Sequence, residues 1–257
     1  MNVADYLSTA WSGCGLAMAS QARAYECKLA SYDTSRSSIV HRRTSTQDSS
    51  MRKLALYGSG GFAREILMLL EDMSLGDRVT ALYESDDIWN ERVVAGIATQ
   101  PISRFEPSTT DLVIAVGSPQ ARRKMQASLP VQTRYPTLVH PDARVHRSST
   151  VGEGSIICAG SIVTCDVVIG RQVNLNLSTT VGHDCRLEDF VTTAPGVNIS
   201  GNCLLGAGSY FGTNSCLREK VRVAADAIVG MGAVVVGDLP DAGGVYVGSP
   251  ARLKPAP

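Results

Sequence analysis

A six-residue repeat dominates the C-terminal part of this 257-residue chain. From Val139 to Val235, every sixth residue is apolar at sixteen of the seventeen positions, and Thr193 is the single exception. A second series, four residues after the first, consists largely of small side chains such as Ser, Thr, Cys and Ala. No helix has this period. A period of six predicts a parallel β-helix built from hexapeptide repeats.

Three such repeats make one triangular coil of eighteen residues, and successive coils stack at the strand spacing of roughly 4.8 Å. We expect the large apolar residue to point into the prism and the small residue to fit near a corner. Glycine often follows the apolar residue, where we expect it to ease the backbone around the bend. These glycines are Gly152, Gly170, Gly182, Gly206, Gly212 and Gly230. The β-helix is predicted over residues 139–240, with a C-terminal tail at 241–257.

Two different regions precede the repeats. Residues 52–136 alternate short apolar strands with amphipathic helices, as in KLALY followed by GSGG and FAREILMLLEDM. This alternation predicts a small Rossmann-like α/β domain. Residues 1–51 are rich in Ser, Thr and Arg without apolar periodicity, and are expected to be a poorly ordered extension. Either Met51 is the biological start or the extension is a genuine flexible tail, and both interpretations stay open.

Composition limits the classes of function. Lys+Arg and Asp+Glu both total 24, so charge gives no reason to expect nucleic acid or an anionic membrane as a partner. There is no run of eighteen apolar residues and no basic leader segment, so neither a membrane span nor a signal peptide is predicted. The seven cysteines lack CxxC spacing, and Cys185 and Cys203 are expected to pack as buried thiols. We therefore expect a metal-free protein of the reducing cytoplasm.

The segment GSGGFA, residues 58–63, satisfies the GxGxxG/A pattern between a predicted strand and a predicted helix. Glu84 lies at the end of the next predicted strand, as in dinucleotide-binding domains. Glycine N–H groups and a helix N-terminus suit any pyrophosphate, so the pattern alone fits NAD as well as a nucleotide-sugar. Because the α/β region is short for a full dinucleotide fold, a dehydrogenase is the weaker alternative.

His183 is the only histidine in the last hundred residues. Residues eighteen apart stack in neighbouring coils, so Cys165 and Gly201 should flank His183, with the Gly201 N–H exposed towards a ligand. A neutral imidazole, with a pKa near ~6.5, can act as a base at physiological pH. Neighbouring residues on a strand point to opposite faces, so Asp184 can contact His183 only at a corner or in irregular backbone. Spacing alone leaves a surface histidine and a catalytic base both open.

Four features occur together in one order: LYGSGGFAREI, the repeats, VGHDCRLEDF and GVYVGSPAR. Together they resemble the NeuD/PglD/VioB-like sugar acetyltransferases, which are hexapeptide-repeat enzymes with a left-handed β-helix. The resemblance covers about residues 52–254. It implies a homotrimer that uses acetyl-CoA, without a metal, to acetylate the amino group of a nucleotide-linked amino sugar. O-acetylation of a sugar hydroxyl, as in the sialic acid branch, and a non-catalytic scaffold are the alternatives.

The resemblance also implies roles for particular residues. His183 corresponds to the catalytic base, Asp184 to the acidic neighbour that raises its basicity, and Gly201 to a glycine whose N–H polarises the thioester carbonyl. Thr192 stands where many family members have a second histidine near the coenzyme thiol, and Phe62 where His or Gly is common. The implied coenzyme and site-orienting positions are Asn176, Thr192, Gly201, Thr213 and Met231, and the implied nucleotide-sugar contacts are Gly60, Gly61, Phe62, Glu84, Ser85 and Gly117.

Overall fold

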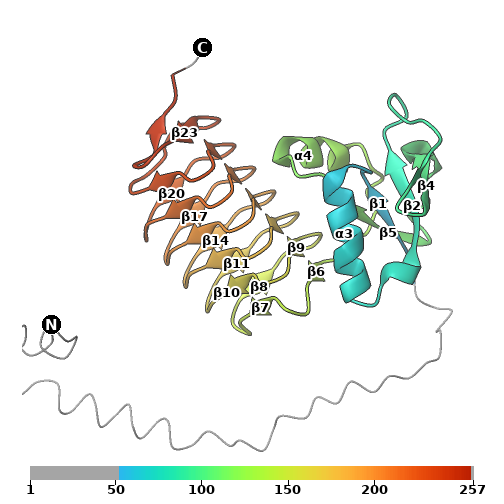
Figure 1. The fold of residues 1–257 in the computed structure, drawn as a ribbon, viewed down its shortest axis with the longest axis horizontal. Coiled ribbons are helices and arrows are strands. Elements are labelled where there is room, and N and C mark those ends of the chain that lie inside the picture. Colours follow the sequence, from blue (N-terminus) through green and yellow to red (C-terminus); the bar gives the residue numbers. More distant parts are fainter. Residues whose placement is uncertain (1–51, 256–257) are drawn as a thin grey trace, which may run out of the picture. The chain divides into compact units, whose positions relative to one another are not determined.

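A computed structural model describes residues 52–255 of the chain, and the predicted extension at 1–51 lies outside them. The described residues begin with an α/β domain and continue as a stack of short parallel strands (Figure 1). The second part is the left-handed parallel β-helix that the six-residue period and the family resemblance predict together. The predicted fold class is therefore confirmed.

The α/β domain is built on a five-stranded sheet with the order β3-β4-β2-β1-β5. β1 pairs in parallel with β2 and β5, β2 pairs in parallel with β4, and β3 is antiparallel to β4. The carboxyl ends of β1, β2 and β5 therefore lie side by side, which is where open α/β sheets bind ligands. The elements are β1 (Lys53–Tyr57), α3 (Gly61–Asp72), η1 (Gly76–Arg78), β2 (Val79–Glu84), β3 (Val93–Val94), β4 (Ile97–Pro101), η2 (Ile102–Arg104), β5 (Thr110–Ile114) and α4 (Pro119–Ala127).

The two helices of the α/β domain differ in what they contact. The apolar side of α3, including Ile66 and Leu70, is fully buried. It belongs to one apolar cluster with Leu138, Ile156 and Cys158 of the first β-helix coils, so this cluster joins the two parts of the chain. α4 starts with a Ser118 cap, whose hydroxyl accepts from the backbone of the third helical residue. Such caps fix the first residue of a helix and hence the loop before it.

The β-helix has three faces of parallel strands. The eight-stranded face contains β6 (Leu138–Val139), β9 (Ile156–Ile157), β12 (Asn174–Leu175), β15 (Thr192–Thr193), β18 (Tyr210–Phe211), β21 (Ile228–Val229), β23 (Val245–Val247) and β24 (Arg252–Leu253). The six-stranded face contains β7 (Arg144–Val145), β10 (Ile162–Val163), β13 (Thr180–Val181), β16 (Asn198–Ile199), β19 (Cys216–Leu217) and β22 (Val234–Val235). The five-stranded face contains β8 (Thr150–Val151), β11 (Val168–Ile169), β14 (Arg186–Leu187), β17 (Leu204–Leu205) and β20 (Arg222–Val223).

The interior of the β-helix follows the predicted series. All of its large inward positions from Ile157 to Val235 are buried, and the first three positions are partly buried against the same core. The small series is also buried from Ser155 onward, for example at Ser155 and Cys185. Thr193 fits among the apolar residues because its hydroxyl hydrogen-bonds the Thr179 hydroxyl at 2.8 Å. A satisfied hydroxyl removes most of the cost of placing a polar group in the core.

The glycines that follow the inward residues begin several of the corner turns, as where the Ser155 N–H donates to Gly152 O at 3.3 Å, but they do not take the left-handed conformation. The left-handed backbone conformation falls two residues later, at every sixth residue from Gly154 to Gly232, and it includes Asp184 with φ 59°. The glycines also permit close stacking of coils. A Cβ on Gly152 would lie 2.3 Å from the Gly170 carbonyl oxygen, and a Cβ on Gly182 would lie 2.6 Å from the Gly201 nitrogen.

The segment after residue 240 is more than the tail that the sequence predicts. β23 pairs in parallel with β21 and so extends the eight-stranded face, and β24 turns back antiparallel to β23.

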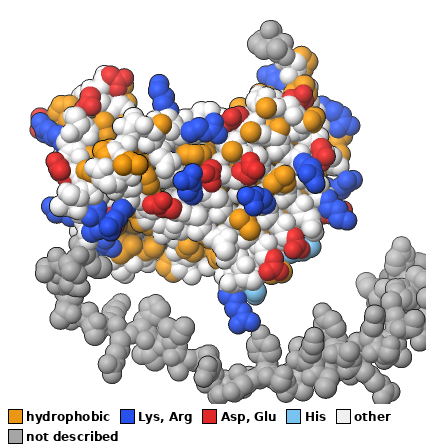
Figure 2. All heavy atoms as spheres, turned by 180° about the vertical axis from the view of Figure 1, so that it is seen from behind, with side chains coloured by type: hydrophobic (Ala, Val, Ile, Leu, Met, Phe, Trp, Pro, Cys, Tyr) orange, Lys and Arg blue, Asp and Glu red, His pale blue; other side chains and the backbone are white. Residues whose placement is uncertain are grey.

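On the face seen in Figure 2, Lys and Arg side chains are interspersed with Asp and Glu. Within residues 52–255, no helix is long and apolar enough to cross a membrane.

Candidate active site

His183 and Asp184 form a hydrogen-bonded pair at the corner between the six- and five-stranded faces. The corner follows β13, and His183 Nδ1 lies 2.7 Å from Asp184 Oδ2. The contact between these neighbours depends on the left-handed conformation of Asp184, the irregular backbone that the sequence argument required. Both side chains are exposed, at 58% and 55%. Because a carboxylate only accepts hydrogen bonds, Nδ1 carries the proton and Nε2 keeps a lone pair for a ligand.

Gly201 lies against the imidazole of His183, as the eighteen-residue spacing predicts. A Cβ on Gly201 would be 2.6 Å from His183 Nε2, so a side chain here would displace the ring. Gly201 as a whole residue is buried in the single chain, and the prediction that its N–H faces a ligand stays a prediction. The Gly201 N–H has no acceptor among residues 52–255, so it keeps a free donor beside the imidazole.

Cys185 and Cys203 lie below this corner, inside the β-helix. Both thiols are buried, and the Cys203 N–H donates to Cys185 Sγ at 3.3 Å. The interaction between the two neighbouring thiols lowers the pKa of Cys203, and together with burial it raises the pKa of Cys185. Both thiols face the core, which confirms that they are buried packing residues.

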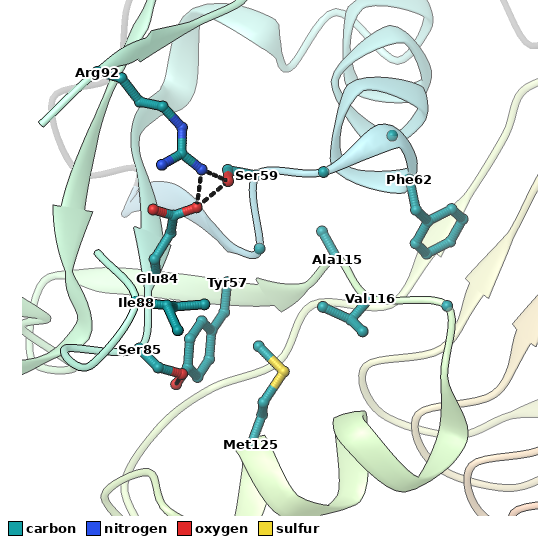
Figure 3. A pocket seen from close by; sticks show the side chains of 14 residues that line it. Tyr57, Ser59, Phe62, Glu84, Ser85, Ile88, Arg92, Ala115, Val116 and Met125 are labelled. Carbon is teal, nitrogen blue, oxygen red and sulfur yellow. Dashed lines mark hydrogen bonds and ion pairs between the residues drawn. The ribbon is translucent and has the colours of Figure 1, made fainter. Parts of the chain in front are cut away.

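The glycine turn lines a cavity of about 530 Å³ at the carboxyl ends of β1, β2 and β5 (Figure 3). The structure brings all six predicted nucleotide-sugar positions to this cavity: Gly60, Gly61, Phe62, Glu84, Ser85 and Gly117. Its wall also contains residues that the sequence analysis missed, namely Tyr57, Ser59, Ile88, Arg92 and Met125. Ser59 lies within the glycine-turn motif and Tyr57 directly precedes it, whereas Ile88, Arg92 and Met125 belong to no motif and become neighbours of the turn only through the fold.

A hydrogen-bonded cluster fixes one wall of this cavity. The Glu84 carboxylate is only 7% exposed and accepts hydrogen bonds from Ser59 and Arg92. Arg92 also donates to the Ser59 hydroxyl at 3.0 Å (Figure 3). Nearby, the Tyr57 and Ser85 hydroxyls are 3.0 Å apart. The Glu84–Arg92 pair is internally neutral, so it adds little net charge to the cavity.

The predicted coenzyme positions lie at different places on one chain. Asn176, Thr192 and Thr213 line a second cavity of about 280 Å³, and Phe62 and Gly117 lie in the walls of both cavities. Met231 is 82% exposed, eighteen residues beyond Thr213 along the same corner. Gly201 belongs to the other corner, with His183. A single chain therefore does not assemble these five residues into one site.

Arg122 is the most deeply buried charged residue that the sequence analysis missed. The sequence of α4 is largely polar and gives no sign of burial, yet Arg122 is 0% exposed. Its guanidinium contacts both the loop before α4 and the Thr192 hydroxyl.

Within residues 52–255, no group of three or more His, Cys, Asp or Glu side chains could hold a metal ion.

Comparisons with known proteins agree with this architecture. Residues 53–129 match the family described as the PglD N-terminal domain. The chain is 27% identical over 185 residues to a GDP-perosamine N-acetyltransferase from Escherichia coli O157:H7, covering 66% of this chain and 80% of that protein.

Solved structures add the second part of the chain to the comparison. The acetyltransferase domain of PglB from Neisseria gonorrhoeae, solved with acetyl coenzyme A, has 32% identity and a TM-score of 0.72, covering 79% of this chain and 99% of that one. PerB from Caulobacter crescentus, solved with CoA and GDP-perosamine, has 26% identity and a TM-score of 0.71, covering 80% and 99%.

The α/β domain, the β-helix and the histidine corner together define an acyltransferase of the hexapeptide-repeat class. Within that class, the chain belongs to the NeuD/PglD-like family of sugar acetyltransferases. The predicted resemblance is thereby confirmed.

Proposed function

We propose that this enzyme transfers the acetyl group of acetyl-CoA to the amino group of a nucleotide-linked amino sugar. The nucleotide is UDP, dTDP or GDP, and the product serves the synthesis of a surface polysaccharide or glycan. The relative that acts on GDP-perosamine and the structures solved with CoA support this chemistry. The observation that carries the proposal is the exposed His183–Asp184 pair, with Nε2 unoccupied beside Gly201.

In the proposed mechanism, His183 acts as the general base. Its Nε2 takes a proton from the sugar amine as the nitrogen attacks the thioester carbonyl, and Asp184 stabilises the imidazolium that forms. The Gly201 N–H donates to the oxyanion of the tetrahedral intermediate. When the intermediate collapses, the C–S bond breaks, and the imidazolium returns its proton to the CoA thiolate. No step requires a metal.

We further propose that the working enzyme is a homotrimer. His183 and Gly201 lie at one corner of the prism, whereas Asn176, Thr213 and Met231 lie at another. An elongated coenzyme can contact both sets if the histidine corner of one subunit faces the other corner of its neighbour. The cleft between two prisms also provides the concave surface that a single prism lacks. Acetyl-CoA would lie along this cleft, near Thr192, Thr213 and Met231.

The glycine-turn cavity is the proposed site of the nucleotide-sugar. Its glycine backbone and the N-terminus of α3 suit a diphosphate. The Glu84 carboxylate suits the ribose hydroxyls. The adjoining second cavity leads from the glycine turn to the face of the β-helix, where the sugar would sit. The five cysteines within residues 52–255 are free thiols, which supports a reducing compartment such as the cytoplasm.

The test is turnover by the full-length protein with acetyl-CoA and a panel of GDP-, UDP- and dTDP-linked 4-amino sugars. We expect CoA thiol release with at least one of them, and a product whose added acetyl group mass spectrometry locates on nitrogen. Release only with substrates that offer a hydroxyl would favour O-acetylation. A protein that binds acetyl-CoA but releases no thiol with any acceptor would favour the scaffold alternative.

A further inference from the structure

Arg122 makes an unusual set of contacts for a buried cation. Its guanidinium donates to Val116 O at 3.0 Å and to Gly117 O at 2.9 Å, in the loop between β5 and α4. It also reaches three acceptors on the β-helix: Gln172 O at 3.1 Å, Phe190 O at 3.0 Å and Thr192 Oγ1 at 2.7 Å. No carboxylate pairs with it among residues 52–255.

A buried charge without a counter-ion is costly, so its retention calls for an explanation. Burial lowers the pKa of Arg122 to about 9, which still leaves the guanidinium protonated at neutral pH. Its five acceptors are neutral oxygens, which stabilise the cation without cancelling its charge. In surroundings of low dielectric, that charge acts over a longer distance than it would in water.

The contacts of Arg122 determine how two peptide groups point. In a trans peptide, the N–H points away from the C=O of the same unit. The Val116 and Gly117 carbonyls face the guanidinium, so the N–H groups of Gly117 and Ser118 point away from it. Neither N–H has an acceptor within the described residues. Gly117 lines both the glycine-turn cavity and the adjoining cavity.

We propose that Arg122 is a positioning residue for the diphosphate of the substrate. It orients the Gly117 and Ser118 N–H groups to donate to the phosphate oxygens, and its uncompensated charge favours an anion there. Arg92, the arginine that lines the glycine-turn cavity, is engaged by Glu84. Thr192 holds the guanidinium through its hydroxyl, which gives a role to the residue that replaces the family's second histidine. This inference rests on the proposed binding of a nucleotide-sugar.

The test compares the binding of nucleoside diphosphates with that of the matching nucleosides, by titration calorimetry on the full-length protein. The probes are GDP, UDP and dTDP against guanosine, uridine and thymidine. Arg122→Met should weaken diphosphate binding by about 10-fold or more and leave nucleoside binding within about 2-fold. Arg122→Lys keeps a charge with fewer donors and should lose part of this preference. In turnover, the KM for the nucleotide-sugar should rise while the KM for acetyl-CoA stays the same.

Arg123 supplies the matched control. It is the neighbouring cation on α4, it also bridges to the β-helix by pairing with Asp226 at 3.1 Å, and its guanidinium lies over the Phe190 ring. Arg123→Met therefore removes an equal charge and a bridge between the two parts, but no contact with residues 116–117. It should leave the preference for diphosphate over nucleoside unchanged.

The outcomes separate the two proposals. Three results would overturn the role of Arg122 and leave the proposed function intact. Arg122→Met could keep the preference for diphosphate over nucleoside, it could lose affinity for both equally, or Arg123→Met could lose as much diphosphate affinity as Arg122→Met does. If Arg122→Met does not fold, Arg122→Lys decides, and an unchanged preference there is equally decisive. A wild-type protein that binds no nucleoside diphosphate and acetylates no nucleotide amino sugar would refute both proposals.

Discussion

The β-helix and the α/β domain place their functional residues by different rules. In the β-helix, the environment of a residue follows from its position in the hexapeptide and from its neighbours eighteen residues away, as for His183 over Gly201. In the α/β domain, function depends on strand ends that the sheet order brings together, as for Glu84 and Arg92. Neighbours in the β-helix can be predicted from intervals of six and eighteen residues in the sequence, whereas neighbours in the α/β domain can be predicted only when the order of the strands in the sheet is known. Four predictions test this contrast.

The largest expected effect is on stability, because inward and outward residues of one β-helix strand differ in burial. Leu205 and Leu204 are adjacent on β17, but Leu205 is fully buried and Leu204 is only partly buried. Leu205→Ala should lower the free energy of unfolding by about 2–5 kcal/mol, and Leu204→Ala by less than about 1 kcal/mol. Urea denaturation of the two variants measures the difference. Equal losses would mean that position in the hexapeptide does not determine burial.

His183→Ala should have the largest effect on catalysis. Removing the proposed general base should lower kcat by ~10²-fold or more, with little change in thermal stability because the side chain is exposed. The control is His146→Ala, which removes another exposed histidine of the β-helix, one that hydrogen-bonds Ser148 at 2.9 Å. Thiol release from acetyl-CoA measures both variants. An unaltered kcat in His183→Ala would eliminate this residue as the base.

Much of the fold and part of the site could be predicted from the sequence. Each repeat restates the same rule, so the period of six predicts the faces and the interior, and the interval of eighteen predicts the contact of His183 with Gly201. The glycine-turn motif and the family resemblance together predict six residues of the cavity. The close approach between coils at the glycines after the inward residues was not predicted, because it is a distance that spacing does not reveal.

The residues that were missed have a common physical reason. Arg122 lies on a short helix where arginine is ordinarily solvated, and its contact with Thr192 joins positions seventy residues apart. Arg92 lies between β2 and β3, and its backbone is hydrogen-bonded to Thr99 of β4. The contact of Arg122 with Thr192 depends on how the α/β domain packs against the β-helix, and those of Arg92 with Glu84 and Ser59 depend on the fold of the α/β domain itself. No local pattern of residues encodes either.

Gly201→Ala tests the close contact on which the histidine corner depends. The new Cβ would lie 2.6 Å from His183 Nε2, so the ring must move, and we expect kcat to fall by about 10-fold or more. A displaced imidazole should also change its NMR shifts. Gly237→Ala is the matched control, because a Cβ there meets nothing within 4 Å. If both variants retain full activity and the imidazole shifts stay the same, the ring is not held by this glycine.

The smallest effect is expected from Glu84→Gln, in the α/β domain, where the spacing of residues in the sequence does not predict which of them become neighbours. The amide keeps the shape of the side chain but removes its charge, which weakens the hold on Arg92 and Ser59. We expect the KM for the nucleotide-sugar to rise about 3- to 10-fold, with kcat and the KM for acetyl-CoA unchanged. Glu91→Gln changes the exposed neighbour of Arg92 and should have no effect. A fall in kcat without a change in the nucleotide-sugar KM would instead connect Glu84 to the reacting groups. The α/β domain would then contribute to the chemical step, and the division of labour between the two regions would not hold.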